Sequence, residues 1–146
     1  MNKIMRKMKE KKGFTLAELL IVVAIIAVLV AISIPIFTAQ LNKAKYATDE
    51  ANARSIYSEM VADYLANGGN QKLTLAGTVE EGKTNQSVTV TYADKSTNKY
   101  NFSGFVTITF TTGTPSQYPK VVVSKCDKAG VSESVTFGEG TASTNN

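Results

Sequence analysis

The chain has 146 residues, with 16 Lys and Arg against 12 Asp and Glu, one cysteine and no histidine. Residues 1–13 carry a net charge of +5, and subtracting it from the total of +4 leaves a net charge of −1 on residues 14–146. This charge argues against a basic nucleic-acid-binding patch in residues 14–146. A lone Cys126 excludes a disulfide within the chain, and without histidine it cannot form a Cys–His catalytic pair, so we interpret it as a small packing residue.

The first predicted segment is a basic leader, residues 1–13, which ends in Gly13. Its lysines and arginine are expected to hold the N-terminus in the cytoplasm, as the positive-inside rule describes. Residues 14–37 follow as an apolar run, interrupted only by Thr15, Glu18, Ser33 and Pro35. A transmembrane helix needs roughly 20 apolar residues. The run is therefore predicted to be a helix that can cross a membrane.

Glu18 is the one carboxylate in this apolar run. A charged side chain near the centre of a membrane helix costs about 2.5–3.5 kcal/mol on insertion scales, so it normally has a partner. The chain has no Lys or Arg between Lys12 and Lys43 to pair with it. Either Glu18 lies near the lipid headgroups, or its partner belongs to another molecule.

Pro35 lies near the end of the same helix. Proline has no amide hydrogen to donate to the carbonyl four residues before it, here that of Ala31, and its ring pushes against that carbonyl. A kink between Ala31 and Pro35 is therefore expected.

A second, amphipathic part of the helix is predicted from residue 38 to about Ala66, because no Gly or Pro occurs between Phe37 and Asn67. Two sets of apolar residues spaced four apart form a single stripe on it: Ile56, Met60 and Tyr64, with Tyr57, Val61 and Leu65 beside them. The glycines in Asn67-Gly68-Gly69 are expected to end the helix in left-handed conformations.

After Gly69 the pattern changes to an alternation of apolar and polar residues, which predicts β-strands. The expected strands are 72–76, 87–92, 106–111, 118–124 and 131–137, with turns at 94–98 and 112–115. Glu80 and Glu81 are interpreted as a solvated turn. Threonine on one face and Val, Ile or Phe on the other indicate an antiparallel sheet with one buried face.

The predicted fold class is therefore α+β, with a long N-terminal helix whose apolar half protrudes and whose amphipathic half packs on a four- to five-stranded antiparallel sheet. The globular domain is expected to comprise residues 38–146, with 138–146 disordered because they are small and polar. The sequence contains no motif that indicates an enzyme, a metal site or a bound cofactor.

The N-terminal residues closely resemble the class III leader of type IV pilins and the related pseudopilins. That pattern is a basic leader, Gly, Phe, Thr, Leu, any residue and Glu, followed by an apolar helix, and here it is filled by Gly13, Phe14, Thr15, Leu16 and Glu18. The resemblance extends to the helix-kinking proline, Pro35, and covers about the first quarter of the chain. It implies the pilin fold.

The resemblance also implies a function. A prepilin peptidase would cut between Gly13 and Phe14 and N-methylate Phe14, and Glu18 would form a salt bridge with the Phe14 amine of a neighbouring subunit. The precursor would cross the cytoplasmic membrane once. The mature chain would then join copies of itself and minor pilins in a surface filament, with an inner-membrane platform and an assembly ATPase. Such filaments serve adhesion, motility or aggregation.

Several alternatives stay open on the sequence. A pseudopilin of a type II secretion or competence system has the same leader. A monomeric membrane-anchored binding module would have the same apolar helix but would not polymerise. An ordinary secretory signal cut after Ala31-Ile32-Ser33 would discard the helix.

Overall fold

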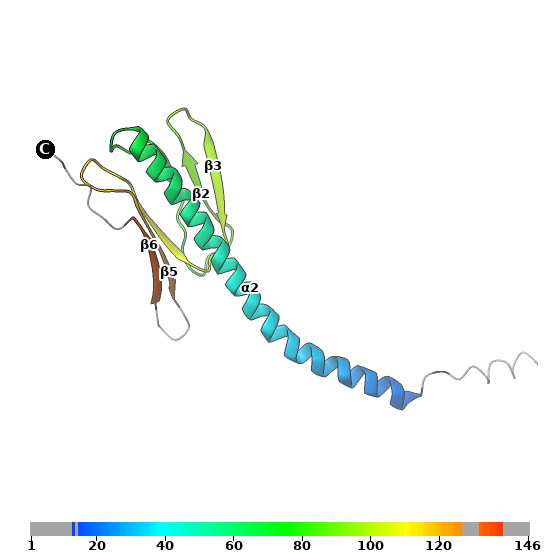
Figure 1. Cartoon of the computed structure of the whole chain (residues 1–146). Coiled ribbons are helices and arrows are strands. Elements are labelled where there is room, and N and C mark those ends of the chain that lie inside the picture. Colours follow the sequence, from blue (N-terminus) through cyan, green and yellow to red (C-terminus); the bar gives the residue numbers. More distant parts are fainter. Residues whose placement is uncertain (1–12, 14, 127–131, 139–146) are drawn as a thin grey trace, which may run out of the picture. The chain divides into compact units, whose positions relative to one another are not determined.

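The computed structural model describes residues 13, 15–126 and 132–138. Within it the chain divides into two compact units, Met1–Gln40 and Leu41–Asn146. Most of the predicted leader and the predicted disordered tail beyond Gly138 lie outside the described residues. A single helix, α2 (Leu16–Ala66, 51 residues), provides the described helical part of the first unit and the first element of the second (Figure 1).

The two ends of α2 agree with the sequence prediction to within two residues. At its C-terminal end, the N–H of Gly69 donates to the carbonyl of Tyr64 at 2.9 Å, and the N–H of Gly68 donates to that of Leu65 at 3.3 Å. Gly68 and Gly69 both have positive φ angles, 63° and 90°. This pair of bonds is a Schellman motif, which glycine favours because it has no Cβ to clash. The predicted glycine cap is confirmed.

In the described residues six strands follow the helix, and all of their pairings are antiparallel. The first sheet has the order β1-β2-β3, made of β1 (Thr74–Ala76), β2 (Gln86–Thr91) and β3 (Thr97–Phe102). The second has the order β4-β5-β6, made of β4 (Thr107–Thr111), β5 (Lys120–Cys126) and β6 (Ser132–Phe137). The α+β class is confirmed, whereas the single sheet of four or five strands is wrong.

In the described residues the two sheets are connected at one point. After β1 the chain turns at Gly77, and only one isolated bridge, between Val79 and Ile108, connects the two sheets. In this bridge the N–H of Ile108 donates to the carbonyl of Val79 at 3.0 Å. The two sheets therefore meet at one point between β1 and β4.

The second half of α2 packs on both sheets and buries one face. Of the predicted stripe, Ile56, Met60 and Tyr64 are buried, and Tyr57 and Val61 are half-buried. They share the core with side chains from both sheets, among them Val88, Val90, Phe102, Ile108, Val121 and Val123. The prediction that Leu65 belongs to this stripe is wrong, because its side chain is 64% exposed. Leu65 lies about 100° around the helix from Tyr64, beyond the edge of the buried face.

Three acidic side chains of α2 hold the loops and strands that pack against it. Asp49 accepts hydrogen bonds from Ser103, and Asp63 accepts from the backbone N–H groups of Lys72 and Leu73. Glu59 Oε1 accepts from the Tyr100 hydroxyl at 2.6 Å and from the Asn98 side chain at 3.0 Å. Hydrogen bonds to charged groups each contribute about 1.5–3 kcal/mol, so these carboxylates fix the position of the helix on the sheets.

Candidate assembly segment at the N-terminus

The described part of the N-terminal segment begins at Gly13, which is exposed. A Cβ added to Gly13 would meet no atom within 4 Å. Phe14, the predicted site of cleavage and methylation, lies outside the described residues, as does residue 12 on the other side. Processing at Gly13 and Phe14 therefore stays a prediction.

Thr15 and Glu18 form a reciprocal pair of hydrogen bonds at the start of α2. The N–H of Thr15 donates to Glu18 Oε2 at 3.0 Å, and the N–H of Glu18 donates to Thr15 Oγ1 at 3.2 Å. This is a capping box, in which two amide groups that the helix leaves without partners are satisfied. This role was not predicted from the sequence, although its signal, Thr-x-x-Glu before an apolar run, is present in Thr15-Leu-Ala-Glu18.

Glu18 therefore has a local function within the chain. Its negative charge in the first turn is also favourable beside the positive end of the helix dipole. No ion pair with Glu18 occurs among the residues that the structure describes. The carboxylate is exposed, with one oxygen used by the cap.

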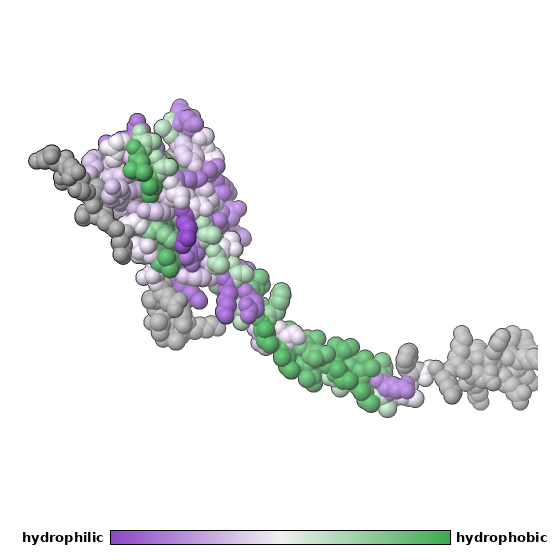
Figure 2. All heavy atoms as spheres, in the orientation of Figure 1, coloured by the Kyte–Doolittle hydropathy of each residue, from purple (hydrophilic) through white to green (hydrophobic). Residues whose placement is uncertain are grey.

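The apolar side chains in the first part of α2 are exposed throughout. From Leu16 to Leu41 each large apolar side chain is between 41% and 77% exposed. Figure 2 shows the result as a hydrophobic surface along this stretch of the helix. By length and composition the helix can cross a membrane. Burial of apolar surface is favourable by about 25 cal/mol per Å², so this surface requires a lipid or protein covering.

The helix is continuous through Pro35. On either side of the proline a hydroxyl donates to a backbone carbonyl four residues earlier: Ser33 to Leu29 at 2.7 Å and Thr38 to Ile34 at 2.9 Å. Hydroxyl groups bound in this way often accompany bent helices. The kink itself stays a prediction.

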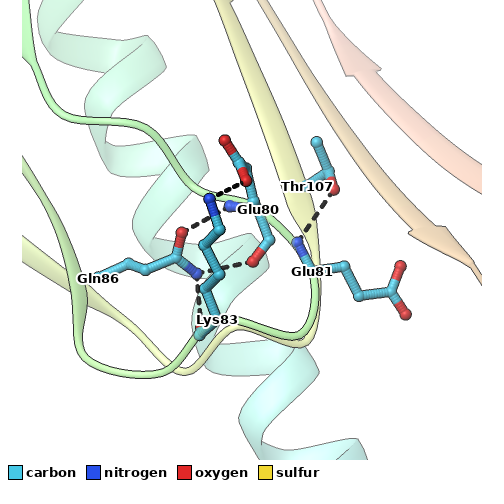
Figure 3. Close-up of polar contacts among 5 residues, drawn as sticks. All are labelled: Glu80, Glu81, Lys83, Gln86 and Thr107. Carbon is cyan, nitrogen blue, oxygen red and sulfur yellow. Dashed lines mark hydrogen bonds and ion pairs between the residues drawn. The ribbon is translucent and has the colours of Figure 1, made fainter.

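The acidic pair Glu80 and Glu81 lies in an exposed turn, as predicted (Figure 3). Gln86 organises this turn: its Oε1 accepts from the N–H of Glu80, and its Nε2 donates to the carbonyls of Glu80 and Lys83, each at 2.7 Å. Glu80 also forms an ion pair with Lys83, and the N–H of Glu81 donates to Thr107 Oγ1. Across the described ranges, no group of three or more His, Cys, Asp or Glu side chains is placed to hold a metal ion.

A family model described as a prokaryotic N-terminal methylation motif matches residues 8–34, which include the capping box and most of the apolar stretch. No solved structure was found to match the chain. The chain therefore carries, at residues 8–34, the class III prepilin leader found at the start of type IV pilins.

Proposed function

We propose that the protein is a type IV pilin, the major structural subunit of a surface filament that polymerises through the first part of α2. The observation that carries the proposal is the combination of the prepilin leader with an exposed apolar helix surface from Leu16 to Leu41, ahead of a folded α+β unit. A lipid bilayer would cover this surface in the precursor, and neighbouring helices would cover it in the filament.

Processing is the first step. A prepilin peptidase cuts the peptide bond between Gly13 and Phe14 and methylates the amine that is released. The leader motif implies this processing. The cut removes the basic leader and creates a positive charge at Phe14, four residues before Glu18 in the sequence.

Pairing between subunits is the second step. The capping box uses Oε2 of Glu18, and the second oxygen can accept a hydrogen bond from the methylated Phe14 amine of a neighbouring subunit. Removing one partner of a buried ion pair typically costs about 3–5 kcal/mol, because the other charge is left without compensation. The pair would therefore select one axial position of each subunit relative to the next.

Helix packing is the third step. Near Pro35, a shallow groove of about 380 Å³ is lined by Val30, Ser33, Ile34, Phe37 and Thr38. Grooves next to small or hydroxyl-bearing residues let apolar helices approach closely, as they do in membranes. An apolar side chain of a neighbouring subunit fits such a groove.

Mass spectrometry of protein sheared from the cell surface tests the proposal. A polymeric fraction whose N-terminus is N-methyl-Phe14 is expected, in long filaments. Processed protein found only in short, cell-envelope assemblies would instead identify a pseudopilin of a secretion or DNA-uptake system. Uncut protein found only in membranes would contradict polymerisation and leave a monomeric anchor.

A further inference from the structure

Two lysines follow the apolar part of α2 at the level of a membrane surface. Leu16–Leu41 comprises 26 residues, or roughly 39 Å of helix at 1.5 Å per residue. A bilayer is about 30 Å thick in its hydrocarbon core and about 40–45 Å with its headgroups. When Leu16 lies at the outer edge of the cytoplasmic headgroups, the helix spans the whole bilayer, and Lys43 and Lys45 reach the headgroups of the opposite leaflet.

An open groove begins at the same turn of the helix. It has a volume of about 470 Å³ and is lined by Leu41, Ala44, Lys45 and Thr48 of α2 and by Phe102 and Ser103 at the end of β3. Its apolar side chains are Leu41 and Ala44 of the helix and Phe102 of the strand. The groove therefore combines an apolar surface with the cationic side chain of Lys45.

The charges around this groove favour an anion. Neither Lys43 nor Lys45 forms an ion pair with any described residue. Lys45 Nζ lies 5.4 Å from the centre of the Phe105 ring, which leaves its hydrogen-bonding capacity unused. Asp49 also lines the groove and its negative charge offsets one lysine, so Lys43 and Lys45 together leave a net charge of +1; both oxygens of Asp49 are already used, since they accept hydrogen bonds from Ser103.

The other charged side chains near the groove also favour binding of an anion. Glu50, the next carboxylate along the helix, faces Arg54, with 3.8 Å between the charged groups. Lys125 of β5 lies over the ring of Tyr46 at 5.0 Å and adds a further positive charge to the same turn.

We propose that Lys43, Lys45 and the groove beside them bind the phosphate headgroup of an anionic phospholipid in the outer leaflet. This contact would hold the folded unit at the membrane surface before the subunit is extracted into the filament. The inference rests on the membrane-anchored precursor in the proposed function. A cationic side chain near an anionic membrane surface strengthens binding by about 1 kcal/mol, which corresponds to about fivefold per lysine.

A tryptophan reporter tests this contact. The chain contains no tryptophan, so an Ala47→Trp substitution at an exposed position of α2 reports only on lipids beside this turn. The full chain is reconstituted in bilayers that contain either brominated phosphatidylglycerol or brominated phosphatidylcholine, and the ratio of quenching gives the lipid preference. In the proposed topology the basic leader is on the cytoplasmic side, so it would not affect this reporter.

The reporter is compared in three backgrounds. The unmodified background should prefer phosphatidylglycerol, and Lys43→Gln with Lys45→Gln should lower that preference by at least about fivefold. Lys95→Gln with Lys99→Gln makes the same change of charge at two exposed lysines near the β2–β3 turn, and should leave the preference unchanged. An unchanged preference in the first double variant, or an equal loss in both, would overturn the proposal.

The experiment also separates this inference from filament formation. Quenching by both lipids without any preference would reject the lipid site but leave the membrane anchor and polymerisation intact. Absence of quenching by either lipid would contradict the anchored precursor itself, and the lipid site with it.

Discussion

Asp49 and Ser103, 54 positions apart in the sequence, are joined by two hydrogen bonds in the interior of the folded unit. The backbone N–H of Ser103 donates to Oδ1 of Asp49 at 2.9 Å, and the Ser103 hydroxyl donates to Oδ2 at 2.7 Å. Asp49 is 1% exposed, so its carboxylate depends on these two bonds for most of its hydrogen bonding. These bonds attach the beginning of the packed part of α2 to the connection between β3 and β4.

Replacing Asp49 should therefore destabilise the folded unit. In Asp49→Ala the N–H of Ser103 loses its acceptor, which costs about 1–3 kcal/mol for a buried group. Asp49→Asn keeps one side-chain oxygen as an acceptor and should cost less. Urea unfolding of the full chain in detergent, followed by tyrosine fluorescence, measures both. An Ala variant as stable as the unmodified protein would show that the bonds contribute nothing.

Two glycines with positive φ angles should respond very differently to alanine. At Gly104, with φ +83°, a Cβ would lie 1.9 Å from the carbonyl oxygen of Lys83, and Gly104→Ala should cost about 2–4 kcal/mol through strain and displacement of the backbone. At Gly68, with φ +63°, a Cβ meets nothing within 4 Å, so Gly68→Ala should cost only about 1–2 kcal/mol. Equal losses of stability in the same unfolding assay would contradict this ranking.

Tyr100 should make the stability of the protein fall at alkaline pH. Burial, together with its hydrogen bond to Glu59, raises the pKa of Tyr100 from 10.0 to about 12, and burial also raises the pKa of Tyr92. Because the folded state favours the neutral phenol, the Tyr100 contribution is fully present below pH 10. It decreases as the pH rises and is lost above about 12.

Unfolding curves between pH 8 and pH 12 measure this decrease. In Tyr100→Phe the loss of stability across this range should be smaller, because the side chain no longer ionises. Tyr118→Phe is the matched control, since Tyr118 is 38% exposed and its ring packs on that of Tyr64. A decrease of the same size in Tyr100→Phe would assign the effect to another group.

Much of the fold could be predicted from apolar patterning. The helix and strands β2, β4, β5 and β6 follow from periodic Val, Ile, Phe and Thr. Strand β3 could not be found, because Thr97-Asn-Lys-Tyr-Asn-Phe102 is mostly polar and exposed. Its extended form comes from six residue pairs with β2, and from Asn98 and Tyr100 binding Glu59 on the helix.

The polar residues were the least predictable. Asp49 lies on the same helix face as Ala53, Ile56 and Met60. An acidic residue is normally expected on the solvent side of a helix. Only the hydrogen bonds from Ser103 explain the burial of Asp49. For the N-terminal segment, the sequence motif predicted where the assembly chemistry should lie. The capping box of Thr15 and Glu18 gives the carboxylate a second role. The motif alone does not distinguish this role from an ion pair with the Phe14 amine of a neighbouring subunit.

The measurement that tests the central claim most directly is the yield of sheared surface filaments from cells that express Glu18→Gln or Thr15→Ala. Glutamine at position 18 can still complete the capping box but has no charge, whereas alanine at position 15 removes the cap, at about 0.5–2 kcal/mol, and keeps the charge. If Glu18 pairs with the Phe14 amine of a neighbour, Glu18→Gln abolishes filaments and Thr15→Ala retains them, with both precursors present in the membrane. Normal filaments from Glu18→Gln, or their loss only in Thr15→Ala, would contradict the account.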